Sequence, residues 1–202
     1  MKAPQQPTAQ EVKALRERTG AGMMDCKAAL IEAGGDIEAA VDILRAKGAA
    51  DAAKRADRAA NEGYIDAYIH MGRVGSMVEV NCETDFVSRG EDLRTFAHEV
   101  ALHVASLNPT FLSLDDVPED FRERERAIFM EEAKDVDERF RERAVEGKLA
   151  KRLKELTLLE QEFVRDQGEK KPRTIEALRQ EVAAKVGENV TIRRFVRYEL
   201  GR

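Results

Sequence analysis

The chain has 202 residues, of which 43% are hydrophobic and 36% are charged, and its formal net charge at pH 7 is -5. This length allows one large or two small domains, and the density of charge indicates long solvated helices rather than a compact sandwich. The net negative charge argues against a nucleic-acid-binding protein, because such a protein needs a basic face to neutralise phosphates.

The two cysteines, Cys26 and Cys82, lie far apart and form neither a zinc-binding pattern nor a disulfide framework, which favours a reducing compartment. The N-terminal residues lack the apolar stretch of a signal peptide, and no apolar run is long enough to cross a bilayer. We therefore expect a cytoplasmic protein that makes no membrane contact.

The N-terminal part of the chain predicts three short helices joined by glycines. Thr8 can cap the first helix, which we expect to end at Gly20, and apolar residues at helical spacing predict a second helix over Met23–Ala33. A third helix is predicted over Ile37–Lys47, with Gly48 as its end. Three helices of this length form a small bundle, and the alanine-rich segment after them is typical of a linker.

Two consecutive methionines, Met23 and Met24, begin the second of these helices. Adjacent positions on a helix cannot both face one core, so at least one of the two side chains is expected to be exposed. An unbranched, polarizable methionine suits an adaptable binding surface, and an exposed one here is a candidate contact residue.

A β-hairpin is predicted after the linker. Alternating residues over Gly63–Met71 predict a strand with one buried face, and Val74–Cys82 predicts its partner, with the turn at Met71–Arg73. The second strand leads into Thr84–Val87, which we expect to be a loop.

Phe86 stands in this loop among acidic residues, and two interpretations of it are open. In the first, Phe86 folds back as the hydrophobic anchor of the following helix. In the second, it points outward and inserts into a partner, since loops on rigid scaffolds often carry function. Composition alone favours the first interpretation, because most phenylalanine side chains are at least partly buried.

The rest of the chain is predicted to be mostly helical. An amphipathic helix is predicted over Leu93–Leu107, and a single long charged helix over Glu119–Glu146. A last helix that ends at Val186 is followed by a strand over Val190–Leu200.

These elements together predict an α+β fold, in which the three-helix bundle precedes a core domain with a three-stranded antiparallel sheet packed with helices. We place the domain boundary in the linker, which gives residues 1–55 to the bundle and residues 56–202 to the core domain. A sheet this small leaves two open edges, and pairing across a dimer would cover them.

The sequence contains no recognisable pattern of an active site. His98 and His103 are five positions apart on a predicted helix, face different directions and cannot chelate one metal ion. Cys82, Asp85 and His98 can be imagined as a thiol triad, but a cysteine in a valine-rich strand needs only a packing role. Neither a nucleophile elbow nor a phosphate-binding glycine loop is present. We therefore expect a binding protein with no catalytic residue, metal or cofactor.

Three stretches of the chain resemble the signatures of one bacterial protein family. Leu15–Leu30, continued by Gly34–Ala40, resembles the N-terminal signature of elongation factor Ts. Glu79–Val87 resembles the second signature and Gly187–Arg194 the third. The matches come in the family's order and spread over nearly the whole chain, so the protein is identified as a member of this family in a short form with a single core half.

The resemblance implies a guanine-nucleotide exchange factor that binds elongation factor Tu·GDP and promotes GDP release during translation elongation. It implies that the N-terminal bundle is similar to ubiquitin-associated domains and docks on the partner's nucleotide domain. The residues matching the family's contacts there are Lys13, Arg16, Met23 and Met24.

The second signature is implied to act at the nucleotide site. Asp85 and Phe86 match the pair that approaches this site, where the phenylalanine wedges between partner side chains and disturbs the magnesium and phosphate surroundings. The exchange loop implied in this way comprises Thr84, Asp85, Phe86 and Val87.

Two further expectations concern partners. In short forms of the family a homodimer can supply the second core half, which agrees with the open sheet edges. A competing interpretation from another class is an adaptor whose three-helix bundle binds peptides or ubiquitin-like surfaces, and which leaves Thr84–Val87 unused.

Overall fold

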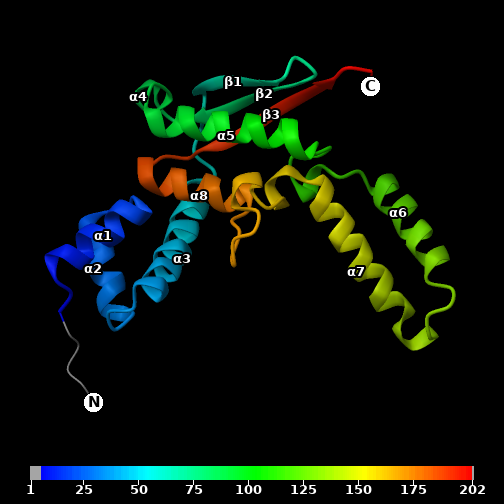
Figure 1. The fold of residues 1–202 in the computed structure, drawn as a ribbon, viewed down its shortest axis with the longest axis horizontal. Coiled ribbons are helices and arrows are strands. Elements are labelled where there is room, and N and C mark those ends of the chain that lie inside the picture. Colours follow the sequence, from blue (N-terminus) through cyan, green and yellow to red (C-terminus); the bar gives the residue numbers. More distant parts are fainter. Residues whose placement is uncertain (1–5, 202) are drawn as a thin grey trace. The chain divides into compact units, whose positions relative to one another are not determined.

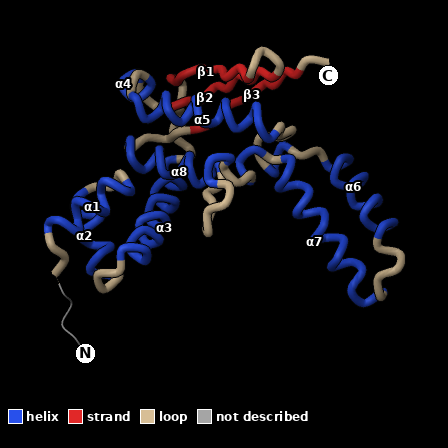
Figure 2. Tube along the Cα trace, in the orientation of Figure 1, coloured by secondary structure: helices blue, strands red, loops and turns tan. Residues whose placement is uncertain are grey.

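The computed structural model describes residues 6–201, which form eight α-helices, three short 3-10 helices and one three-stranded antiparallel sheet (Figures 1 and 2). The predicted α+β fold class is confirmed. The helices are α1 (Ala9–Thr19), α2 (Met23–Glu32), α3 (Ile37–Arg55), α4 (Asp85–Ser88), α5 (Glu91–Leu107), α6 (Glu119–Glu132), α7 (Glu138–Leu156) and α8 (Ile175–Val186), and the 3-10 helices are Leu114–Asp116, Leu158–Glu160 and Val164–Asp166.

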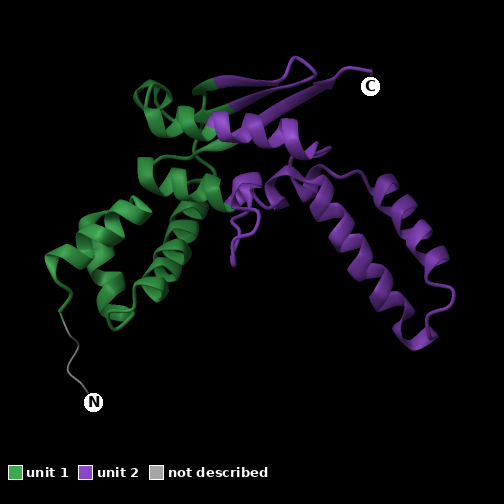
Figure 3. Ribbon diagram, in the orientation of Figure 1, with its two compact units in different colours: residues 1–64, 80–96, 177–191 green, residues 65–79, 97–176, 192–202 purple. Residues whose placement is uncertain are grey.

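The chain divides into two compact units, each assembled from separated segments of the sequence (Figure 3). Unit 1 comprises residues 1–64, 80–96 and 177–191, and unit 2 comprises residues 65–79, 97–176 and 192–202. Several elements pass from one unit to the other, namely α5, α8 and all three strands of the sheet. The predicted domain boundary between residues 55 and 56 stays a prediction.

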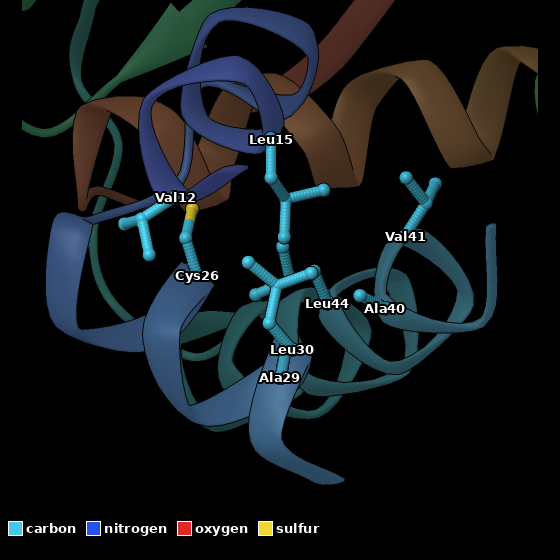
Figure 4. Close-up of a cluster of buried hydrophobic side chains, with 8 residues drawn as sticks. All are labelled: Val12, Leu15, Cys26, Ala29, Leu30, Ala40, Val41 and Leu44. Carbon is cyan, nitrogen blue, oxygen red and sulfur yellow. The ribbon is translucent and has the colours of Figure 1, made fainter. Parts of the chain in front are cut away.

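The bundle of α1, α2 and α3 in unit 1 forms as its caps predict. Thr8 caps α1 through a reciprocal pair of hydrogen bonds, because its hydroxyl accepts from the Glu11 amide and its own amide donates to the Glu11 carboxylate. Asp36 caps α3 by accepting from two amides of its first turn. Apolar side chains from all three helices meet in one cluster, shown in Figure 4: Val12, Leu15, Cys26, Ala29, Leu30, Ala40, Val41 and Leu44.

The third helix is longer than predicted, because α3 continues through Gly48 to Arg55. A glycine in a helix interior costs about 1 kcal/mol relative to alanine. The alanine-rich residues that follow Gly48 add no further cost, because alanine is the best helix former. A Cβ atom at Gly48 would lie 3.4 Å from the Ala184 side chain of α8. Gly48 therefore lies inside the helix, on the side that faces α8, and does not end α3.

The sheet has the order β1-β2-β3, with β1 (Glu62–His70), β2 (Val74–Cys82) and β3 (Thr191–Glu199). The predicted hairpin turn is confirmed, since the Arg73 amide donates to the His70 carbonyl oxygen at 2.9 Å. The prediction of a buried face on β1 was wrong: Tyr64, Asp66 and Tyr68 are only half-buried, and Ile65 and Ile69, on the other face of the strand, are exposed. As an edge strand, β1 has less cover than the central strand β2.

The predicted long helix over Glu119–Glu146 was also wrong, because the chain reverses between α6 and α7, which form a helical hairpin in unit 2. Neither glycine nor proline marks the reversal. Instead the Arg141 guanidinium donates to the carbonyl oxygens of Ala133, Lys134 and Val136, which holds the segment between α6 and α7 against the start of α7. Asp137 caps α7 by accepting from the Arg139 amide.

A buried histidine connects α5 to the segment after α7 within unit 2. His103 is fully buried, its Nε2 donates to Gln161 Oε1 at 2.9 Å, and its Nδ1 accepts from the Val164 amide at 3.2 Å. The neutral imidazole therefore has a hydrogen-bond partner at each of its two ring nitrogens. Burial lowers the pKa of His103 to about 4.

Candidate partner-binding site

The predicted loop over Thr84–Val87 is a turn of helix. Thr84 has extended backbone and is the N-cap of α4, with its hydroxyl accepting from the Val87 amide. Asp85 lies in the first turn, where a negative charge suits the helix N-terminus, and the Ser88 hydroxyl donates back to the Asp85 carbonyl oxygen at 2.9 Å. The turn thus has regular hydrogen bonding of its own, which a flexible loop would lack.

Phe86 points away from the protein, and Val87 takes the anchoring role instead. The Phe86 side chain is 84% exposed, whereas Val87 is 8% exposed. Phe86 is therefore not the hydrophobic anchor of the following helix. A large aromatic side chain held in water on an ordered turn is the arrangement expected of a contact residue.

A glutamate from the other end of the chain holds the start of this turn. Glu188 Oε2 accepts from the amides of Glu83 and Thr84 at 3.0 Å each. Its Oε1 accepts from the Thr84 hydroxyl at 2.6 Å. The carboxylate reaches the turn because α8 ends at Val186 and Gly187 then adopts a left-handed backbone (φ 77°), a conformation that glycine adopts without strain.

The next residue extends this set of contacts to the end of α3. The Asn189 amide donates to Glu83 Oε1 at 2.6 Å, and its side-chain Nδ2 donates to the carbonyl oxygens of Ala56 and Arg58. Arg58 in turn forms an ion pair with Glu83 at 3.4 Å. Asn189 is buried, so these hydrogen bonds form away from water and each lost one would leave an unpaired polar group.

An open groove of about 700 Å³ lies beside Phe86, between α4, the start of α5 and the end of α8, all within unit 1. Charged side chains of both signs line it. Asp85 pairs with Arg89 at 3.0 Å, and Lys185 pairs with Asp92 at 2.5 Å. A partner that receives Phe86 would meet this charged surface around it.

Cys82 lies directly before the turn but has no reactive character. Burial, followed by the nearby Glu188 carboxylate, raises the pKa of the Cys82 thiol to about 11. The thiol donates to the Thr84 carbonyl oxygen at 3.2 Å. Because nucleophilic attack requires the thiolate, a thiol protonated at neutral pH argues against the imagined triad.

The four expected contact residues of the bundle all face solvent. Lys13 and Arg16 are exposed on α1, and the Lys13 ammonium lies 3.7 Å from the Glu17 carboxylate. Met23 and Met24 begin α2, and both are exposed, Met24 by 75%. The prediction that at least one of these methionines is exposed is confirmed, whereas the contacts of all four residues with a partner stay predictions.

Neither a metal site nor a membrane-spanning helix is found in residues 6–201. No three side chains of histidine, cysteine, aspartate or glutamate in this range come together so that they could hold a metal ion. None of the helices in the same range is both long and apolar enough to cross a membrane.

The contacts made by Glu188 and Asn189 were missed from the sequence. Both residues belong to the third stretch, Gly187–Arg194, which resembles the family signature, and they lie between the predicted last helix and the predicted last strand. Their hydrogen bonds to Glu83 and Thr84 span more than a hundred positions, and no local pattern reveals such a pairing.

Comparisons with known proteins place these features in a family. The sequence model described as elongation factor TS matches residues 17–171. Elongation factor Ts of Caldanaerobacter subterraneus subsp. tengcongensis is 53% identical over 197 residues, which cover 96% of both chains. Elongation factor Ts of a Thermoanaerobacter species is 52% identical over 197 residues, covering 96% of this chain and 95% of its own.

A longer relative matches as well. Elongation factor Ts of a Synechococcus species is 50% identical over 194 residues, covering 94% of this chain and 74% of its own. The matched region of the family model and the extent of these identities show that the chain belongs to the elongation factor Ts family.

Proposed function

We propose that this protein is a guanine-nucleotide exchange factor of translation, which binds elongation factor Tu·GDP in the cytoplasm and promotes the release of GDP. Its membership of the elongation factor Ts family supports the proposal. The single observation that carries it is Phe86, an 84% exposed aromatic side chain on the ordered turn α4.

The proposed role of Phe86 is to insert into the partner beside the bound nucleotide. Burying an exposed phenylalanine side chain contributes about 2 kcal/mol to association. Because the turn is already ordered by Thr84 and Glu188, little conformational entropy is lost when the side chain docks. An aromatic anchor of this kind is a typical binding hot spot.

Exchange follows from competition between two ligands of one partner. The nucleotide is held through its phosphates and Mg²⁺, and in this proposal Phe86 and Asp85 disturb these surroundings. If the factor weakens GDP binding, linkage requires that GDP weakens factor binding by the same amount. The factor therefore needs no catalytic acid, base or nucleophile: it stabilises the nucleotide-free partner until another nucleotide binds.

The bundle is proposed to supply affinity rather than exchange. Its contact residues Lys13, Arg16, Met23 and Met24 lie on α1 and the first turn of α2, and all are exposed. Flexible methionine side chains adapt to a partner surface, and the two cations at neighbouring turns of α1 can pair with acidic groups.

We also propose that two copies of the chain pair through the outer face of the sheet in unit 2. Alternation places Ile65 and Ile69 of β1 on one face, and a Cβ atom at Gly75 of β2 would lie 3.9 Å from Ile69. Met77 follows two positions after Gly75 on β2, and β3 exposes Val196 and Tyr198. An uncovered apolar face of this kind is typical of an interaction surface. The exposed apolar side chains of the three strands are Ile65, Ile69, Met77, Val196 and Tyr198, and Leu200 follows directly after β3.

The exchange proposal is tested by the rate at which a fluorescent GDP leaves elongation factor Tu, with and without this protein. The proposal predicts faster release with increasing factor concentration, up to a plateau. Release at the spontaneous rate with a folded factor would contradict it and favour the adaptor interpretation of the bundle.

A further inference from the structure

The hydroxyl of the N-cap residue Thr84 makes two hydrogen bonds, a long one of 3.5 Å with the Val87 amide of α4 and a short one of 2.6 Å with Glu188. The Thr84 hydroxyl has one hydrogen and two lone pairs, and it accepts from the Val87 amide. The same hydroxyl donates to Glu188 Oε1 at 2.6 Å. The carboxylate can only accept, so it fixes the hydroxyl hydrogen toward itself and leaves a lone pair for the Val87 amide.

The other oxygen of the same carboxylate holds the backbone that leads into the turn. Glu188 Oε2 accepts from two successive amides, those of Glu83 and Thr84, at 3.0 Å each. A single carboxylate thus receives three hydrogen bonds around the N-cap residue. Bonds to an ionised acceptor are about twice as strong as neutral ones, so the N-cap has little freedom to rotate.

We propose that Glu188 is the positioning residue of the exchange turn, residues 84–88: by holding Thr84 it fixes the direction in which Phe86 projects. The inference rests on the proposed function, because it concerns how Phe86 acts in exchange. Glu188 lines the groove beside Phe86, and the hydrogen bonds that it accepts from Glu83 and Thr84 are the route by which its effect is proposed to pass through the turn. Phe86 lies two positions after Thr84, and a rotation at the N-cap would redirect its ring.

The position of Glu188 is itself fixed by its neighbours along the chain. Before it, Gly187 turns the chain at the end of α8, and after it Asn189 is buried with three hydrogen bonds to Ala56, Arg58 and Glu83. A carboxylate attached to such a rigid backbone can transmit that rigidity to the turn. Glu188 therefore presents Phe86 in an ordered state before the partner arrives.

The test is a double-mutant cycle on the full-length protein, with fluorescent GDP release from elongation factor Tu as the readout. The variants are Glu188→Ala, Phe86→Ala and the two combined, and each is titrated to give a maximal rate and a half-saturating concentration. Misplacing a group that acts in the rate-limiting step costs about ten- to a hundredfold in rate. We expect Glu188→Ala to lower the maximal rate by about tenfold.

The combined variant separates positioning from other roles. If Glu188 acts only through Phe86, its removal has no further effect once Phe86 is alanine, so the combined variant equals Phe86→Ala. If the rate losses of the two single variants multiply in the combined variant, the inference is overturned, because Glu188 would then act on exchange by another route. A full maximal rate in Glu188→Ala would overturn it as well.

Two controls keep the result interpretable if Glu188→Ala is poorly folded. Glu188→Gln keeps the shape but replaces one acceptor oxygen by an NH₂ donor, and we expect a maximal rate between those of the wild type and Glu188→Ala. Glu123→Ala removes an exposed glutamate of α6 and is expected to keep the wild-type rate. An unchanged rate in Glu188→Gln, with Glu188→Ala unfolded, would count against the inference.

A readout that does not depend on the partner distinguishes failure of the positioning role from failure of the proposed function. Hydrogen exchange of the amides at residues 83–88 should be at least about tenfold faster in Glu188→Gln than in the wild type. The variant lacks hydrogen bonds that oppose opening of this turn, so the turn opens more often. Unchanged amide exchange would overturn the inference. If the amides respond but the wild type never accelerates GDP release, the proposed function fails and the positioning role in exchange fails with it.

Discussion

Phe86 and Val87 are consecutive residues of one helical turn, yet the Phe86 side chain is 84% exposed and that of Val87 is 8% exposed. A helical turn sends adjacent side chains in different directions, so one of the two can anchor the turn while the other reaches a partner. Opposite effects of their substitution on stability and activity are therefore expected.

Stability should depend on Val87 and hardly at all on Phe86. Val87→Ala removes two buried methyl groups and is expected to lower the free energy of unfolding by roughly 2 kcal/mol. Phe86→Ala is expected to change the same quantity by less than about 0.5 kcal/mol, as is usual for an exposed site. Urea denaturation followed by circular dichroism measures both, and a strong loss in Phe86→Ala would show that this ring supports the fold.

Acidification should destabilise the protein through His103. Burial lowers the pKa of this residue from 6.5 to about 4, so the unfolded chain binds more protons than the folded one between these values. Stability is therefore full above about pH 6.5 and falls as the pH drops toward 4, by up to about 3 kcal/mol. Denaturation of the wild type and His103→Asn at several pH values measures this, and an equal pH dependence in both would contradict the assignment.

The outer face of the sheet should control the oligomeric state. Ile69 is 71% exposed on β1, and an aspartate there would place a charge in the proposed contact between two copies. Sedimentation at micromolar concentration is expected to show a dimer for the wild type and a monomer for Ile69→Asp. Met24 is exposed to a similar extent, 75%, but lies in the bundle, so the Met24→Asp variant should remain dimeric. A monomeric wild type would contradict the proposed pairing of two copies.

The bundle and the exchange turn should affect different parameters of GDP release. Met24→Asp is expected to raise the half-saturating concentration of the factor about thirtyfold, since a hot-spot side chain contributes about 2 kcal/mol to binding. Its maximal rate should stay near that of the wild type. The opposite pattern, a lower maximal rate at unchanged half-saturation, would mean that the bundle acts on exchange itself.

Much of the fold follows from local patterns in the sequence. Thr8 and Gly20 bound the first helix as a cap and a breaker should, and the alternation of residues locates both strands of the hairpin. Local rules failed where distant contacts decide the outcome. Gly48 does not end α3, which continues past it on the side that faces Ala184 of α8, and Arg141 donates to the carbonyl oxygens of the segment between α6 and α7.

The candidate site was predictable only in part for the same reason. The resemblance to a known family indicated Phe86 and the exposed methionines by position. The order of the turn around Phe86 was not predictable, because it depends on a carboxylate 104 positions from Thr84. Such a pairing arises from the tertiary fold and leaves no spacing in the sequence that could indicate it.

The central claim, that exchange depends on the exposed ring of Phe86, is tested most directly by one comparison. Release of fluorescent GDP from elongation factor Tu is measured at saturating concentrations of the wild type, Phe86→Ala and Phe140→Ala, the last removing an exposed phenylalanine of α7. We predict that Phe140→Ala matches the wild type and that Phe86→Ala loses most of the acceleration while remaining folded. Undiminished acceleration by folded Phe86→Ala would contradict the account.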